Sequence, residues 1–244
     1  MVHTTKGIVL RTTAYGETSV IALVYTELFG LQSYMVNGVR SNKKGNTKGN
    51  IYQPGSIIEM EVYHNELKKL HRVRETRWHY IYRDILFNIY KNATVLFMIE
   101  LLQKTIRQPE ENPDLYNFIE DALIELDKAG TTTAANYPLF FLVHLPAFLG
   151  FSIQDNYSVP ENILNLKDGR FVAGVPHHEY YVPPPLSEYI SDLMHVRHPS
   201  ESEQIPLNNA TRRQITDHLL HFYRLHIQDF ASMRSLSVLQ QVFS

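Results

Sequence analysis

Five short segments with the composition of β-strands fill the first eighty residues, and this pattern limits the fold more than any other feature. The segments are rich in Ile, Val, Tyr and Thr, and turn-forming residues separate them. They are GIVLRTT, TSVIALVYTE, LQSYMVNGV, SIIEMEVYH and LKKLHRVRE. Five short strands in so short a stretch are typical of a small closed barrel, because closure removes exposed sheet edges.

The spacing of apolar residues changes to a helical period near Trp78. We therefore expect an α+β protein, in which a five-stranded barrel over residues 1–79 precedes a helical domain over residues 80–244. The predicted helices occupy 80–108, 113–130, 133–149, 186–198, 208–230 and 235–243. Residues 150–185 are proline-rich and are expected to form an irregular insertion with a hairpin at Asp168-Gly169.

The composition restricts the class of protein. The chain contains no cysteine, so it has no disulfide bonds and a zinc site would need His and carboxylate ligands alone. Its most apolar stretch, 139–151, is shorter than the roughly 20 residues that a membrane-spanning helix needs. The N-terminus lacks the apolar core of a secretory signal. We expect a cytoplasmic protein without a membrane segment.

Motifs of the common enzyme classes are absent from the sequence. It contains no GxxxxGK[ST] phosphate loop, no GxGxxG, no GxSxG elbow and no HExxH. The pairs His195/His198 and His218/His221 have helical spacing, but a structural zinc site needs about four converging ligands. We interpret the histidines as surface or partly buried side chains, and we predict no catalytic residue, metal or cofactor.

Positive charge is concentrated in the predicted barrel. Residues 1–80 contain eleven Lys and Arg against six acids, whereas the remainder contains twelve against nineteen. The loop GVRSNKKGNTKGN, residues 38–50, contains four cations and no acid. This asymmetry favours an anionic partner for the barrel, although a solvated face also carries charge.

OB-fold barrels bind oligonucleotides on one sheet face and the adjoining loops, and the cations suit this role. We expect Arg11 to end the first strand, and Arg72 and Arg74 to share one face of the fifth. The predicted phosphate track comprises Arg11, Arg40, Lys43, Lys44, Lys48, Lys68, Lys69, Arg72 and Arg74. Nearby tyrosines can either stack on bases or lie half-buried in strands; they are Tyr15, Tyr34, Tyr52 and Tyr63. Such binding tolerates many sequences and weakens with salt.

Three stretches of the chain, taken in order, have a familiar pattern. KGIVLRTTAYGETSVIALVYTELFG and the following LQSYMVNGVR resemble the opening of the bacterial RecO family of DNA repair proteins. The matching positions are Gly7, Val9, Leu10, Arg11, Tyr15, Glu17, Thr26, Gly30, Gly38 and Arg40. QPGSIIEMEVYH and ELKKLHRVRE resemble the fourth and fifth strands of that family. FYRLHIQDFASMRSLSVLQQVF resembles its closing helix, loop and short helix, with S-x-x-V-L at residues 235–239.

This resemblance implies an N-terminal OB-fold, a C-terminal helical domain and association with the nucleoid in the cytoplasm. It further implies binding of single- and double-stranded DNA and annealing of complementary strands. The family acts with RecR, and often RecF, to load recombinase onto strands covered by single-stranded DNA-binding protein. It also contacts the acidic, apolar C-terminal tail of that protein. Arg212 and Arg213, beside an apolar helix face, are our candidates for this contact.

Many members of the family carry a four-cysteine zinc module, and here the chain departs from the pattern. The corresponding residues, 150–185, contain no cysteine, so we expect a metal-free loop and hairpin in its place. Two other functions stay open. An OB-fold RNA-binding module, for instance in ribosome maturation, would differ by preferring RNA, since the 2′-OH discriminates. A hydrolase acting through the histidine-rich C-terminal half would differ by containing stoichiometric metal.

Overall fold

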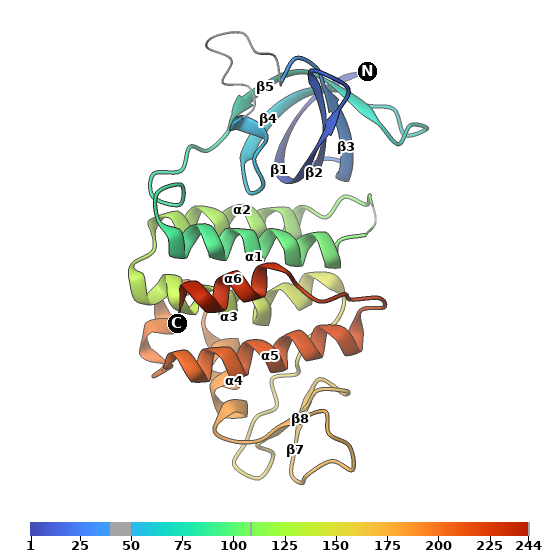
Figure 1. The fold of residues 1–244 in the computed structure, drawn as a ribbon. Coiled ribbons are helices and arrows are strands. Elements are labelled where there is room, and N and C mark those ends of the chain that lie inside the picture. Colours follow the sequence, from blue (N-terminus) through green and yellow to red (C-terminus); the bar gives the residue numbers. More distant parts are fainter. Residues whose placement is uncertain (40–49, 108, 244) are drawn as a thin grey trace. The chain divides into compact units, whose positions relative to one another are not determined.

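Figure 1 shows the computed structural model of the chain, which describes residues 1–39, 50–107 and 109–243. The strands are β1 (Val2–Tyr15), β2 (Ser19–Thr26), β3 (Gly30–Val36), β4 (Ile57–Tyr63), β5 (His71–Trp78), β6 (Ile163–Asn165), β7 (Arg170–Val172) and β8 (Tyr181–Val182). The α-helices are α1 (Ile89–Thr105), α2 (Pro113–Lys128), α3 (Thr131–His144), α4 (Leu186–His195), α5 (Asn209–His226) and α6 (Ser235–Val242). Short 3-10 helices are η1 (Asn50–Tyr52), η2 (Leu145–Leu149) and η3 (Pro199–Gln204).

The first five strands close into a barrel with the neighbour order β1-β2-β3-β5-β4, and β4 pairs with β1. Every pair is antiparallel except β3 with β5. Alternate side chains of β2, namely Val20, Ala22 and Val24, fill the interior together with Tyr34 and Met60. The predicted OB-fold barrel followed by a helical region is therefore confirmed.

The chain divides into two compact units. Unit 1 comprises Met1–Leu86 and Ile99–Asp127, and thus contains the barrel, the end of α1 and nearly all of α2. Unit 2 comprises Phe87–Met98 and Lys128–Ser244. The predicted domain division after residue 79 stays a prediction.

Helix α2 packs against the β1–β2 side of the barrel within unit 1. Tyr116 lies stacked beside Tyr25 of β2, with 6.3 Å between the ring centroids. The carboxylate of Glu120 lies 3.3 Å from Nζ of Lys6 on β1, and it accepts a hydrogen bond from the Tyr116 hydroxyl at 3.3 Å. These contacts make α2 a structural part of the barrel unit.

Helix α1 begins at Ile89, so the predicted helical start at residue 80 was wrong. The backbone N–H groups of residues 83–85 each donate to the carboxylate of Asp127 at 2.9 Å. These bonds hold the segment in a non-helical path, and the Asn88 side chain then accepts from a backbone N–H of the first turn of α1 at 3.1 Å.

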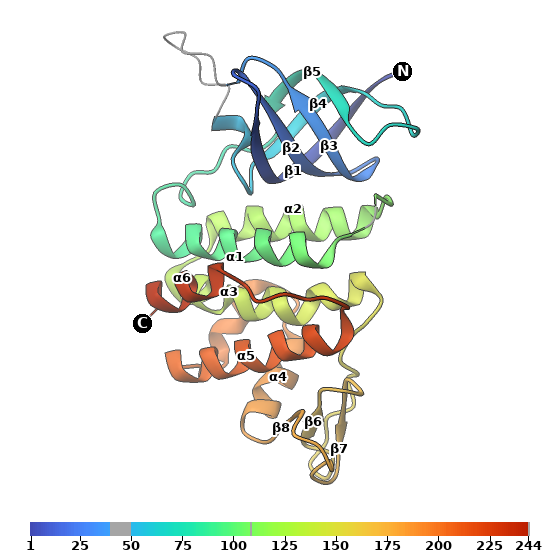
Figure 2. The same ribbon diagram turned by 45° about the vertical axis from the view of Figure 1, so that its right-hand side comes forward.

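Unit 2 contains the remaining helices, and Figure 2 shows α5 running beside α3. The expected break in the third helix is present, since α3 ends at His144 and η2 continues to Leu149. The expected hairpin is formed by β6 and β7, and β8 pairs with the other edge of β6. In the described part of the chain, no helix has the length and apolar character to cross a membrane.

Candidate nucleic-acid interface

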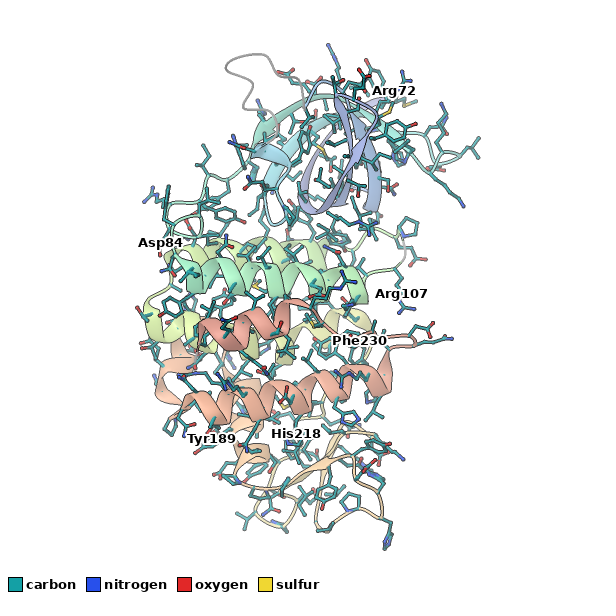
Figure 3. The ribbon with its side chains drawn as sticks, viewed as in Figure 1. Arg72, Asp84, Arg107, Tyr189, His218 and Phe230 are labelled. Carbon is teal, nitrogen blue, oxygen red and sulfur yellow. The ribbon has the colours of Figure 1, made fainter. Side chains whose placement is uncertain are left out.

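The strand register places Arg72 in a row of side chains on the outer face of the barrel. Arg72 on β5 lies opposite Met35 on β3, which lies opposite Ile21 on β2. Ile21 in turn lies opposite Thr13 on β1. Directly opposed residues point to the same side of a sheet, so the row crosses four strands. Arg72 lies at one end of this row and is exposed, as Figure 3 shows.

Arg11 lies on the same outer face, one row away. It pairs with Leu23, which shares a face of β2 with Ile21 because side chains alternate along a strand. Arg11 is exposed, but the prediction that it ends the first strand was wrong. Strand β1 instead continues past a β-bulge as far as Tyr15.

Arg74 differs from these two arginines because its charge is paired. Its Nη1 lies 3.1 Å from a carboxylate oxygen of Glu61 on β4, and the next arginine of β5, Arg77, is paired with Glu59. Within the described residues, by contrast, Arg72 forms no ion pair. The outer face of β4 and β5 near Arg74 therefore has alternating rather than positive charge.

The connection between β4 and β5, residues 64–70, presents Lys68 and Lys69 to solvent. Asn65 shapes this connection, because its side-chain oxygen accepts from the backbone N–H of Leu67 and its carbonyl accepts from that of Lys68, both at 2.9 Å. In OB-folds this connection borders the oligonucleotide-binding face.

Two hollows flank residues 64–70. The first encloses about 750 Å³ and is lined on its cationic side by Lys68, Lys69 and Arg107. The second encloses about 720 Å³ and is lined by Lys68 and Arg72, with the exposed Tyr63 beside them. The structure thus brings three of the predicted cations around one connection.

Arg107 is a candidate that sequence reasoning missed. It follows the end of α1 and is exposed (Figure 3). It lines the first hollow together with Glu111, whereas the lysines come from a stretch nearly forty residues earlier. A single arginine two residues before a proline gives no sign of this placement in the sequence, because the placement depends on tertiary packing.

Two of the four candidate stacking tyrosines are available at the surface. Tyr15 and Tyr63 are each 51% exposed. Tyr34 and Tyr52 belong to the barrel core, where they are 0% and 3% exposed, so they cannot stack on bases. Burial also raises the pKa of the Tyr34 hydroxyl above its ordinary value.

Four predicted contacts lie outside the described residues. These are the loop cations Arg40, Lys43, Lys44 and Lys48. They stay predictions from the sequence.

The insertion in unit 2 is held by amide side chains and aromatic rings. Asn156 donates to the carbonyl of Phe171 and accepts its backbone N–H, both at 2.9 Å, and the Phe171 side chain is buried. Asn165 similarly accepts from the N–H of Lys167 at 3.0 Å. No group of three or more potential metal ligands converges in the described residues. The insertion does not fit a zinc module.

An apolar hollow in unit 2 lies between α3, α5 and α6. Two arginines of α5 line it, and Arg213 donates to the carbonyl of Gln240 at 2.8 Å. Arg212 is more constrained, because its Nε donates to Asn136 at 2.7 Å. The apolar lining of this hollow includes Pro138, Leu139, Leu236, Leu239 and Phe243.

Comparisons with known protein sequences cover both the barrel and the helical region of the chain. A family model described as recombination protein O N terminal matches residues 1–82, and one described as recombination protein O C terminal matches residues 86–235. The chain is 31% identical to a DNA repair protein RecO of Bacteroides fragilis, over 100% of both chains. It is 29% identical to that of Phocaeicola vulgatus, over 100% of both, and 30% identical to that of Christiangramia forsetii, over 100% of this chain and 99% of the relative.

Proposed function

The chain belongs to the RecO family, and from this premise we propose that it is a DNA repair and recombination mediator without catalytic activity. On this proposal it binds single- and double-stranded DNA and anneals complementary strands. The observation that carries the proposal is the cluster of Lys68, Lys69 and Arg72 around one connection of an OB-fold barrel. Its members are exposed, and their chemistry suits phosphate oxygens.

The mechanism is neutralisation of charge. Two complementary strands repel each other through their phosphates, and cations that contact both backbones lower this barrier. Contacts to phosphate leave the base edges free, so pairing between the strands can proceed on the protein. Arg11 and Arg72 would extend the contact over the outer sheet face, and the loop cations at 40, 43, 44 and 48 would add to it.

The proposed partners rest on the same family membership. We propose that the protein acts with RecR, and with RecF where that protein is needed, to load recombinase. We further propose that the apolar hollow in unit 2 receives the acidic, apolar tail of single-stranded DNA-binding protein. Support comes from Arg213, which places positive charge beside apolar side chains. Arg213→Glu should abolish binding of a tail peptide, whereas Arg224→Glu on the same helix should not.

The test of DNA binding is fluorescence anisotropy with a short single strand across a salt series. The wild-type protein should bind tightly at low salt with a steep salt dependence, and a variant with Glu at 40, 43, 44 and 48 should bind much more weakly. Strand annealing of two complementary oligonucleotides should be lost in the same variant. Absence of binding by the wild-type protein at low salt, or preference for RNA of the same sequence, would contradict the proposal.

A further inference from the structure

Two histidines close the ends of the connection that carries Lys68 and Lys69. His64 begins this connection and His71 begins β5, and their rings lie 4.6 Å apart with an interplanar angle of 18°. The other face of His64 stacks on Phe29, 3.9 Å away at 7°. The three rings therefore form one stack, which fixes both ends of the connection against the turn between β2 and β3.

Charged and titratable groups surround this stack from each neighbouring element. His3 of β1 lies 6.3 Å from His64, and the amino terminus also faces His64. Glu66 acts on His64 from the connection itself, and the side chain of Gln32 on β3 lies 3.1 Å from Nε2 of His71. Lys68 acts on His71.

Both hollows described above are lined by His64, Lys68 and His71. A phosphate bound by Lys68 would therefore lie beside the stack, whichever hollow it entered. In the free protein, the positive charge of Lys68 disfavours protonation of His71. A phosphate would cancel that repulsion and add an attraction of its own, so the same event that neutralises Lys68 favours an imidazolium in the stack.

We infer that the two hollows form a phosphate site for nucleic acid, with Arg107 as a contact beyond the barrel, and that filling this site is coupled to proton uptake by the His64–His71 stack. This inference rests on the proposed DNA binding and adds its regulation. It makes the affinity of the protein for a polyanion depend on pH through two named side chains.

The direction of the pH dependence follows from the free protein. Burial is the main cause that lowers the pKa of His64 and of His71 below the ordinary 6.5, and neighbouring positive or titratable groups lower both further. A hydrogen bond with the Tyr63 backbone raises the pKa of His71, and Glu66 raises that of His64, but neither reverses the shift. The stack is thus neutral near pH 7. A bound phosphate raises these pKa values, so affinity should rise as the pH falls from the bound-state pKa to the free-state pKa, and should level off below it.

The experiment measures the dissociation constant of a fluorescent single-stranded oligonucleotide between pH 8 and pH 5.5 at constant ionic strength. Uptake of one proton strengthens binding by up to about tenfold per pH unit within the window. Wild-type protein should show this trend. His64→Phe/His71→Phe keeps both rings in the stack but leaves no imidazole there to take up a proton, so this double variant should flatten the trend. His177→Phe, in unit 2, is the matched control and should not.

Titration calorimetry in two buffers of different ionisation enthalpy counts the protons directly. Within the pH range in which affinity rises, the wild-type protein should take up protons on binding, and Lys68→Met should reduce their number, because the phosphate no longer lies beside the stack. Lys68→Met decides the matter if His64→Phe/His71→Phe does not fold. Equal proton uptake in Lys68→Met and the wild type, or an unchanged trend in the folded double variant, would overturn the inference. Arg107→Gln should weaken binding at every pH, and no effect would remove Arg107 from the site.

The result also separates this inference from the proposed function. If the wild-type protein binds no DNA at any pH, the proposed function is wrong. If it binds DNA without taking up protons, DNA binding stands and only the coupling is wrong.

Discussion

Arg74 and Glu61 form an ion pair across β4 and β5, with 3.1 Å between Nη1 and Oε2. Arg72, two residues earlier on the same strand, forms no such pair within the described residues and lines a hollow with Lys68. The two arginines looked equivalent in the sequence, but their electrostatic surroundings differ. A cation already paired with a carboxylate neutralises little additional charge on a nucleic acid.

This difference gives a first prediction. Arg72→Gln should lower the slope of log K against log salt for single-stranded DNA by about 0.7, the value for one lost phosphate contact. Arg74→Gln should change it by much less, and it should also leave Glu61 without its ion pair. Salt series of fluorescence anisotropy on both variants would check this. Equal slopes for the two variants would show that the Arg74–Glu61 pair opens on binding.

A second prediction concerns two glycines with the same backbone angle. Gly16 and Gly30 both have φ +59°, but a β-carbon on Gly30 would lie 2.1 Å from the carbonyl oxygen of Glu110, whereas one on Gly16 would meet nothing within 4 Å. Gly16→Ala should destabilise the barrel by about 1–2 kcal/mol through backbone strain alone. Gly30→Ala should destabilise the barrel by about 1–3 kcal/mol beyond this strain, because the backbone near Glu110 must also shift.

Urea unfolding of the two glycine variants is the measurement. The single tryptophan, Trp78, ends β5, so its fluorescence reports on unit 1. Equal loss of stability in both variants would mean that the packing of the segment near Glu110 against the β2–β3 turn adds nothing to the stability of unit 1.

A third prediction concerns the contact between α2 and the barrel. The pair Lys6–Glu120 is only partly exposed, with 30% and 10% of the two side chains accessible. A double-mutant cycle with Lys6→Met and Glu120→Gln should give a coupling energy of about 0.5–1.5 kcal/mol, and the coupling should shrink in high salt. Urea unfolding followed at Trp78 would measure it. Strict additivity of the two single variants would contradict a stabilising pair.

A fourth prediction follows from Asp127. Burial alone would raise the pKa of its carboxyl, but hydrogen bonds from the backbone of residues 83–85 and from Tyr80 together outweigh burial and lower the pKa. Because the folded pKa lies below the unfolded value, the ionised group stabilises the fold above the unfolded pKa, and this stabilisation is lost as pH falls through the folded pKa.

Asp127→Asn should therefore destabilise unit 1 by about 1.5–3 kcal/mol near pH 7, the range for hydrogen bonds to a charged group. The difference between this variant and the wild type should stay constant from pH 8 to pH 5 and shrink below about pH 4. Unfolding free energies at several pH values would test this. A difference that grew on acidification would rule out an ionised Asp127 as the stabilising group.

Local sequence signals predicted the elements that depend on local physics. The first four strand segments, the start of α2 at Pro113 and the hairpin of β6 and β7 were readable from residue type and spacing. The fifth segment was predicted too early, because β5 begins at His71 and leaves Lys68 and Lys69 in the connection before it. The late start of α1 was not, because the carboxylate that satisfies the backbone of residues 83–85 lies on α2. Asn88, a preferred N-cap residue, was the one local signal that could have marked the true start.

The candidate site was less predictable than the fold. The alternation of β5 gave the exposure of Arg72, but only the barrel register shows that it shares a face with Arg11. Spacing could not reveal the pairing of Arg74 with Glu61, or the approach of Arg107 to Lys68. Tyr34 and Tyr52 are aromatic residues of the kind that stack on bases, but they are buried in the barrel core and cannot reach a base.

One measurement tests the central claim most directly, that the β4–β5 side of the barrel binds nucleic acid. It compares single-stranded DNA affinity across a salt series for Lys68→Gln/Lys69→Gln/Arg72→Gln and for a triple variant of exposed unit 2 cations, Lys167→Gln/Arg197→Gln/Arg224→Gln. Both remove three positive charges. We predict that the barrel variant loses about two units of salt slope and most of its affinity, whereas the unit 2 variant stays close to wild type. Equal losses in both would contradict the account, because binding would then depend on net charge rather than on this face.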